Sequence, residues 1–180
     1  RFEHRKTVGD VMVIEDYAHH PTEGKTTLEA AKRGFTRRIV AVFQPHRYTR
    51  LSKLMAQFAT SFNQADVLVV TEIYPAGEDP IPGATGRALF DEIRQFGHKS
   101  AFFEPDLKQV PALVETLAAP NDMVILLGAV FIITPVPENS ILFLAGALAV
   151  NGQVSLEWVL AASIAGAYLG YDLNYWTGRV

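Results

Sequence analysis

Five short apolar runs recur along the first 128 residues, and they constrain the fold more than any other feature. They occupy residues 11–14, 39–43, 67–70, 101–103 and 123–127 and are rich in β-branched and aromatic side chains. Within each run, apolar residues follow one another without alternating with polar ones. That pattern is typical of strands buried on both faces, as in parallel sheets covered by helices.

The segments between these runs show helical periodicity. The clearest lies near residues 51–62, where one apolar face combines Leu51, Leu54, Met55, Phe58, Ala59 and Phe62. A second helix is expected over residues 21–33, because Pro21 suits a first helical position and Glu23 the first turn. Further helices are expected at 87–96 and 107–117. The alternation predicts an α/β fold: a Rossmann-like, mostly parallel sheet with flanking helices over residues 1–129.

Composition changes abruptly after that region. All five histidines and 15 of the 16 Lys and Arg residues precede residue 131, and residues 154–171 contain a single charge, Glu157. Eighteen such residues reach the lower limit for a membrane span, and Ala162, Gly166 and Gly170 have the spacing of closely packed membrane helices. We therefore expect an apolar helical tail over residues 130–180 that inserts into a membrane; the alternative is a buried helix of a soluble core.

Charge and cysteine content exclude two function classes. The net charge of −3 gives no electrostatic reason to expect nucleic-acid binding, and the absence of cysteine excludes thiol chemistry and disulfides. The first residues, 1–6, are charged and lack the apolar stretch of a secretory signal.

Polar clusters follow three of the predicted strands. They occupy residues 15–23, 43–50 and 71–78. Because ligands of open α/β sheets bind beyond the carboxyl ends of the strands, we expect these clusters to converge on one edge.

Several of these residues have more than one interpretation. Asp16 can bind a ligand or order the turn into the next helix. His19 and His20 could form a zinc site, although no third or fourth ligand stands at a usual spacing. Arg47 and Arg50 are three residues apart, so from a helix start both could face one carboxylate or phosphate; the alternative is a solvated pair.

Together the three clusters resemble a known family. They read DYAHHPTE at residues 16–23, FQPHRYTR at 43–50 and IYPAGE at 73–78, followed by Pro80, Ile81 and Gly83. Their order and spacing resemble the C-terminal domain of Mur-type amide ligases of peptidoglycan synthesis. The resemblance covers about 129 residues.

The resemblance implies an ATP-dependent ligase that joins L-alanine to UDP-N-acetylmuramate through an acyl phosphate. It implies ATP and Mg²⁺ as cofactors, held mostly by a central domain over which this domain closes. By resemblance, Asp16 contacts the ATP ribose, and His46, Arg47 and Arg50 hold L-alanine. Tyr17 and His19 match positions at the edge of the active site. No catalytic residue and no metal ligand is assigned within this segment.

The sequence also departs from the family. Glu15 replaces a usual Asp, and Gly128-Ala129 is followed by Val130-Phe131 where the family has Gly-Asp and a final helix. No Gly-x-x-x-x-Gly-Lys-Ser/Thr phosphate loop and no uridine-nucleotide domain are present. We therefore expect that this chain alone does not ligate and that its partners include the missing N-terminal and central ligase domains.

The tail has a looser resemblance of its own. Residues 135–142 read PVPENSIL and residues 175–179 read YWTGR, which resembles the early part of DedA-type inner-membrane proteins linked to lipid or lipid-carrier transport. Glu138 is a candidate membrane-embedded acid, because a carboxylate in lipid is costly and so functional by default. The alternative places Glu138 at the membrane surface.

Three functions stay open at this point. The leading one is the ligase domain joined to a membrane tail, with residues 1–129 in the cytoplasm and the tail in the inner membrane. The second is a DedA-type membrane protein fragment with a passive N-terminal domain. The third is an artefactual join of two neighbouring coding regions.

Overall fold

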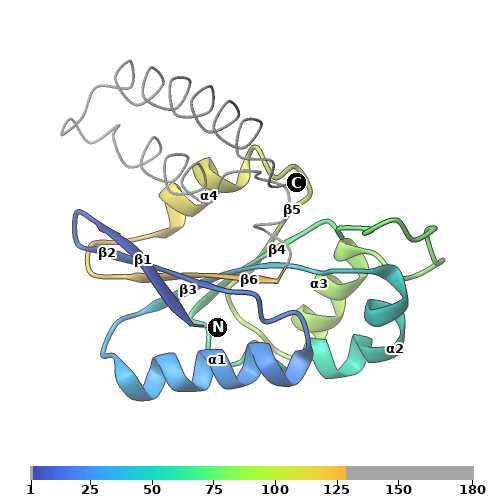
Figure 1. Cartoon of the computed structure of the whole chain (residues 1–180), viewed down its shortest axis with the longest axis horizontal. Coiled ribbons are helices and arrows are strands. Elements are labelled where there is room, and N and C mark those ends of the chain that lie inside the picture. Colours follow the sequence, from blue (N-terminus) through green and yellow to red (C-terminus); the bar gives the residue numbers. More distant parts are fainter. Residues whose placement is uncertain (1, 129–180) are drawn as a thin grey trace, which may run out of the picture. The chain divides into compact units, whose positions relative to one another are not determined.

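The computed structural model describes residues 2–128, which form one six-stranded sheet with four helices (Figure 1). The strands are β1 (Glu3–Val8), β2 (Val11–Asp16), β3 (Ile39–Gln44), β4 (Val67–Thr71), β5 (Ala101–Glu104) and β6 (Met123–Gly128). The helices are α1 (Pro21–Gly34), α2 (Tyr48–Ala59), α3 (Gly86–Gln95) and α4 (Val110–Leu117). All five predicted strands and all four predicted helices are present, with ends displaced by up to three residues.

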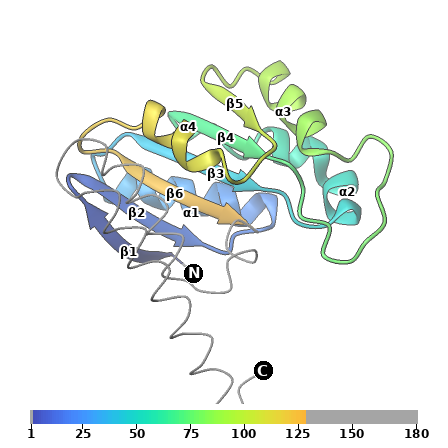
Figure 2. The ribbon, with the colours of Figure 1, turned by 90° about the horizontal axis from the view of Figure 1, so that it is seen from above.

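The sheet has the strand order β1-β2-β6-β3-β4-β5 (Figure 2). Every pairing from β2 to β5 is parallel, and only β1 pairs antiparallel, with β2. The prediction of a mostly parallel sheet is therefore confirmed.

Strand β1 was missed by the sequence analysis, because its charged residues do not form an apolar run. A turn at Gly9, whose φ is +56°, returns the chain from β1 into β2. Arg5 pairs with Glu15 of β2 and with Glu3 of its own strand, the latter at 3.0 Å. This edge strand is held by a hairpin and by ion pairs.

The helices cover the sheet from both sides. Figure 1 shows α1, α2 and α3 on one side of the sheet and α4 on the other. The chain advances along the sheet from β2 to β5 and then returns to place β6 between β2 and β3. Because crossovers between parallel strands are right-handed, a return in the opposite direction places its helix on the opposite face.

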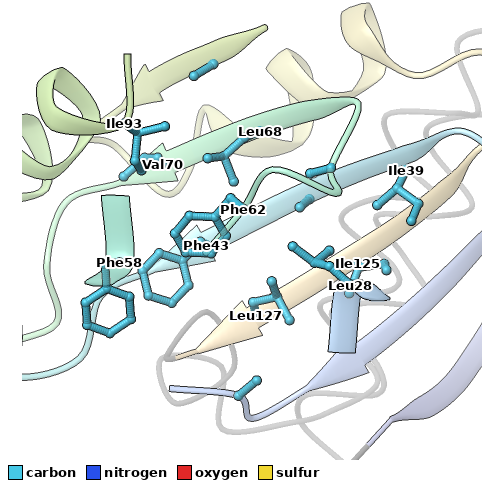
Figure 3. Close-up of a cluster of buried hydrophobic side chains, with 14 of the residues drawn as sticks. Leu28, Ile39, Phe43, Phe58, Phe62, Leu68, Val70, Ile93, Ile125 and Leu127 are labelled. Carbon is cyan, nitrogen blue, oxygen red and sulfur yellow. The ribbon is translucent and has the colours of Figure 1, made fainter. Parts of the chain in front are cut away.

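The core under α1, α2 and α3 includes the apolar face that the sequence predicted for residues 51–62. Phe43 of β3 packs against Phe58 and Phe62, with ring centroids 5.3 and 4.8 Å apart (Figure 3). Leu51 and Ala59 are buried with them, and Leu54 and Met55 pack at the margin. Helix α2 ends at Ala59, so Phe62 reaches the core from the following turn and not from the helix.

Within residues 2–128, no helix is both long enough and apolar enough to cross a membrane. The predicted apolar tail over residues 130–180, its DedA-like motifs and Glu138 lie outside the described residues. They remain predictions.

Candidate functional site at the carboxyl edge of the sheet

The three predicted polar clusters meet at one edge of the sheet. Strands β2, β3 and β4 run parallel, so the loops that follow them leave from the same side (Figure 2). The His46 ring lies 6.5 Å from Tyr17, 6.2 Å from His19 and 5.6 Å from Tyr74, measured between centroids. The predicted convergence is confirmed.

The loop between β2 and α1 is organised by the start of its own helix. His20 is the N-cap residue, and its Nδ1 accepts a hydrogen bond from the Thr22 backbone N–H at 3.4 Å. Glu23 accepts from the backbone N–H groups of His19 and His20, both at 3.0 Å. These bonds satisfy backbone donors near the helix start and fix the path of the loop.

Asp16 ends β2 beneath this loop and is 6% exposed. Its Oδ2 accepts a 2.7 Å hydrogen bond from the hydroxyl of Thr27, which lies in the body of α1 and not in the turn. Both residues line a cavity of about 390 Å³ whose wall also includes Tyr17, Ala18, His19, Thr22, Glu23 and Thr26. Asp16 therefore bonds to the body of α1 and also lines a cavity, and its role toward a ligand stays a prediction.

The loops after β3 and β4 are joined to each other. The Arg47 N–H donates to the Tyr74 carbonyl at 2.9 Å, and the Tyr74 N–H donates to the Pro45 carbonyl at 2.8 Å. This pair of bonds extends the parallel sheet by one bridge, His46 to Tyr74. The two rings stack with an interplanar angle of 13°.

Glu78 ties the same two loops together, a role that the sequence analysis did not assign. Its carboxylate accepts from the Thr49 backbone N–H at 2.9 Å and from the Thr49 hydroxyl at 2.7 Å. It also lies 3.6 Å from the Arg47 guanidinium. Hydrogen bonding from Thr49, followed by the charge of Arg47, holds the pKa of Glu78 below its usual 4.5. A partner 29 residues away leaves no signal in local sequence.

Arg47 and Arg50 do not share a helix face, so that part of the prediction is wrong. Arg47 precedes the first helical residue and has a left-handed φ of +73°. Its guanidinium faces Glu78, whereas Arg50 lies in the first turn of α2 and donates to His46 Nδ1 at 2.9 Å and to the His46 carbonyl at 3.1 Å. Arg47 therefore reaches the site from the residue before α2, and Arg50 reaches it from the helix itself.

His46 is 8% exposed and lies at the centre of this cluster. Burial first, and then the charges of Arg50 and Arg47, lower its pKa from the ordinary 6.5. Near neutral pH His46 is therefore uncharged, and the two arginines supply the positive charge that an anionic ligand would meet.

A metal site finds no support in residues 2–128, where no group of three or more His, Asp or Glu side chains is arranged to hold an ion. The Nδ1 atoms of His19 and His20 bond to different backbone groups, the Tyr17 carbonyl and the Thr22 N–H. The zinc alternative is therefore not supported.

Comparisons with known proteins agree with this geometry. A family model described as "Mur ligase, glutamate ligase domain" matches residues 1–130. The UDP-N-acetylmuramate–L-alanine ligase of Anaeromyxobacter dehalogenans is 49% identical over 138 residues, which cover 77% of this chain and 30% of that protein. The enzyme of the same name from Salinibacter ruber is 48% identical over 130 residues, covering 72% and 27%.

Solved structures give the same result. The crystal structure of a UDP-N-acetylmuramate–alanine ligase from Thermotoga maritima is similar with a TM-score of 0.52 and 30% identity, over 71% of this chain and 25% of that one. A murein peptide ligase from Psychrobacter arcticus gives a TM-score of 0.57 at 25% identity, over 70% and 26%. The chain spans about 30% of the length of the curated relatives it matches.

Proposed function

Because this chain belongs to the Mur ligase family, we propose that its α/β domain positions L-alanine in an ATP-dependent ligase that extends UDP-N-acetylmuramate. The product is an amide-linked precursor of peptidoglycan. The reaction passes through an acyl phosphate, which the amine of L-alanine attacks.

The observation that carries this proposal is the placement of two arginines around His46: Arg50 donates to it, and Arg47, paired with Glu78, lies near enough for its charge to lower the pKa of His46. Arg47 and Arg50 bring two permanent cations beside a buried, uncharged imidazole. Guanidinium groups recognise carboxylates by paired hydrogen bonds, and a clamped carboxylate fixes the position of the attached amine. We assign Arg47, Arg50 and His46 to the carboxylate of the amino acid.

We propose L-alanine and not glutamate as the substrate, although the matching family model is described as a glutamate ligase domain. The relatives that are 46–49% identical are L-alanine ligases. In addition, the rings of Tyr17, His19, His46 and Tyr74 crowd the edge beside the arginines. A small side chain suits such a crowded edge.

The cavity beside Asp16 supports the assignment of a contact with ATP to this domain. Its volume of about 390 Å³ lies within the range of small-molecule sites, and its wall combines a carboxylate with the hydroxyl of Thr27. We assign Asp16 to the ribose and place Tyr17 and His19 at the edge between nucleotide and amino acid. Residues 2–128 do not offer a ligand set for Mg²⁺, so no step is assigned to the ion here.

The remaining ligase functions belong to partner domains. The curated relatives are more than three times as long as the matched segment, so we propose that the phosphate-binding and uridine-binding parts lie in N-terminal and central ligase domains. We expect no turnover from the 180-residue chain alone.

A domain exchange tests the proposal. Residues 1–128 would replace the matching domain of the Anaeromyxobacter dehalogenans ligase, and ADP release would be measured with UDP-N-acetylmuramate, Mg-ATP and either L-alanine or D-glutamate. We expect turnover that depends on L-alanine, and a loss of roughly a hundredfold or more in kcat/KM when Arg50→Lys removes the guanidinium fork. A folded hybrid without L-alanine-dependent turnover would contradict the proposal.

A further inference from the structure

Two histidines at the edge of the sheet have opposite hydrogen-bond partners on their Nδ1 atoms. His46 Nδ1 lies 2.9 Å from a guanidinium nitrogen of Arg50. His19 Nδ1 lies 3.0 Å from the carbonyl oxygen of Tyr17. The rings are 6.2 Å apart between centroids at an interplanar angle of 77°, so they belong to one site.

The partner of His46 fixes its tautomer. A guanidinium has five N–H donors and no acceptor, so Nδ1 of His46 must accept and carries no proton. In a neutral imidazole the proton then lies on Nε2. His46 therefore presents a donor to the site, and its one lone pair is occupied by Arg50.

The partner of His19 fixes the other tautomer. A carbonyl oxygen only accepts, so Nδ1 of His19 donates and carries the proton. Its Nε2 then bears a lone pair, and among the described residues nothing donates to it. The side chain is 26% exposed and lines the cavity beside Asp16, so a ligand can reach it.

The proposed reaction needs such a lone pair. The α-amino group of an amino acid is protonated near neutral pH, and only the neutral amine can attack an acyl phosphate. We propose that His19 Nε2 accepts the proton that the ammonium of the incoming amino acid must lose, while His46 only donates. This inference rests on the proposed ligase function.

The step balances as follows. The ammonium gives one proton to His19, which becomes an imidazolium, and the free amine forms the C–N bond to the acyl carbon. The C–O bond to phosphate breaks, and phosphate leaves with its electron pair. The second proton on nitrogen is released to solvent when the tetrahedral species collapses.

Other basic groups at this edge are already engaged. Glu23 accepts from the backbone N–H groups of His19 and His20 and lies 3.6 Å from His19 Nδ1. Glu78 is bound by Thr49 and Arg47. Among the imidazoles that the structure describes at this edge, His20 and His46 accept at Nδ1 and so carry their proton on Nε2, whereas His19 donates from Nδ1 and keeps a lone pair on Nε2.

The tautomers can be tested on the 180-residue chain itself. Two-bond ¹H–¹⁵N spectra of the imidazoles at neutral pH distinguish a protonated Nδ1 from a protonated Nε2. We expect His19 to carry its proton on Nδ1 and His46 on Nε2. A proton on Nε2 of His19 would overturn the inference, whatever the activity of the ligase.

Kinetics of the domain-exchanged ligase test the proton transfer. His19→Asn places an amide N–H where Nδ1–H lies, so it can still bond to the Tyr17 carbonyl, but it offers no base. We expect kcat for amide formation to fall about a hundredfold. ADP–ATP isotope exchange that needs UDP-N-acetylmuramate but no L-alanine should be retained, because acyl phosphate formation does not use this base.

The matched control is His20→Asn. His20 caps α1, and Asn is an equally good cap, so its turnover should stay within about twofold of the parent. The deficit of His19→Asn should also narrow as pH rises, because solution then supplies more free amine. Equal rates for the two variants would overturn the inference but leave the ligase function standing. An inactive parent hybrid would instead overturn the ligase function, and the inference with it.

Discussion

The loop after β2 and the paired loops after β3 and β4 build one site by different means. In the first, Glu23 and His20 bond to groups two to four residues away. In the second, Arg47 bonds to Tyr74, and Thr49 bonds to Glu78 across 29 residues. The first half is organised by its own helix start, whereas the second half forms only when two loops meet at the finished sheet.

This difference has an energetic consequence. Local capping bonds form together with the helix and cost little additional ordering. Long-range bonds between loops require the sheet to be in place, and here they hold Arg47 in a left-handed conformation that is unusual for a residue with a β-carbon. We therefore expect the half of the site that contains Arg47 to be the more sensitive to changes elsewhere.

The largest expected effect comes from the core that supports both loops. Phe43→Ala removes the ring that packs against Phe58 and Phe62 at the end of β3. We expect a loss of about 3–5 kcal/mol in the free energy of unfolding, measured by urea titration. Phe96→Ala is the control, because that ring is 55% exposed, and its effect should stay within about 0.5 kcal/mol. If the two variants lose equal amounts of unfolding free energy, the packing of Phe43 is not what stabilises the strand end from which the loop leaves.

Replacing a glycine by alanine should change the free energy of unfolding in opposite directions in the two halves of the site. A β-carbon at Gly86 would overlap the Thr71 carbonyl oxygen and lie 2.8 Å from Glu72 Cα, so Gly86→Ala must displace the start of α3. We expect it to lower the free energy of unfolding by about 1–3 kcal/mol.

Gly24 is the matched position on the local side. It lies inside α1, where the nearest atom to an added β-carbon is Phe62 Cε1 at 3.8 Å. Gly24→Ala should raise the free energy of unfolding by about 0.4–1 kcal/mol, because it reduces the entropy of the unfolded chain. Urea titrations of both variants measure the contrast, and changes of the same sign would refute it.

The same contrast explains what could be predicted from sequence. The strands were identified because 39–43 and 123–127 are continuous apolar runs, and the start of α1 because Pro21 and Glu23 are local signals. Convergence of the clusters followed from parallel topology alone. Strand β1 was missed because its stability comes from a hairpin and from Arg5 ion pairs, which leave no apolar pattern.

The details of the site could not be predicted from local sequence patterns. The spacing of Arg47 and Arg50 suggested one helix face, but Arg47 is placed outside the helix by its backbone bond to Tyr74. The partners of the Glu78 carboxylate described above, Thr49 and Arg47, lie 29 and 31 positions away in the sequence, so local sequence does not reveal its role. The roles of Asp16, His46 and the arginines toward ligands stay predictions, as does the domain boundary near residue 129.

A smaller effect is expected from removing the charge that joins the two loops. Thr49 is near the start of α2, where a backbone N–H has no partner within the helix, and Glu78 accepts from it. Glu78→Gln keeps an amide oxygen but loses the charge. We expect roughly threefold to tenfold faster hydrogen exchange of the Thr49 amide in the 180-residue chain.

The neighbouring exposed Asp79 supplies the control for this measurement. Asp79→Asn removes an equal charge one residue away and should leave the exchange of Thr49 unchanged. If both variants accelerate exchange equally, general electrostatics and not the Glu78 bond protects the amide.

The smallest effect is the pH dependence of stability. Burial first, and then the charges of Arg50 and Arg47, lower the pKa of His46 from 6.5. The unfolded chain therefore binds this proton at higher pH than the folded protein does, so the contribution is complete above pH 6.5 and is lost as pH falls through the folded pKa. Glu78, whose pKa is lowered from 4.5, adds a second loss below pH 4.5.

Two variants separate His46 from other contributions to that profile. His46→Asn keeps an acceptor for Arg50 without a titrating ring, and should flatten the fall in urea midpoint between pH 7.5 and 5. His98, whose pKa burial also lowers, contributes in the same window from a position beside Ala65 and Asp66, so His98→Asn serves as the second variant. If only His98→Asn flattens the profile, the neutral His46 does not support the long-range half of the site. Of the two titrating groups assigned to that half, Glu78 would then be the one that contributes to its pH dependence.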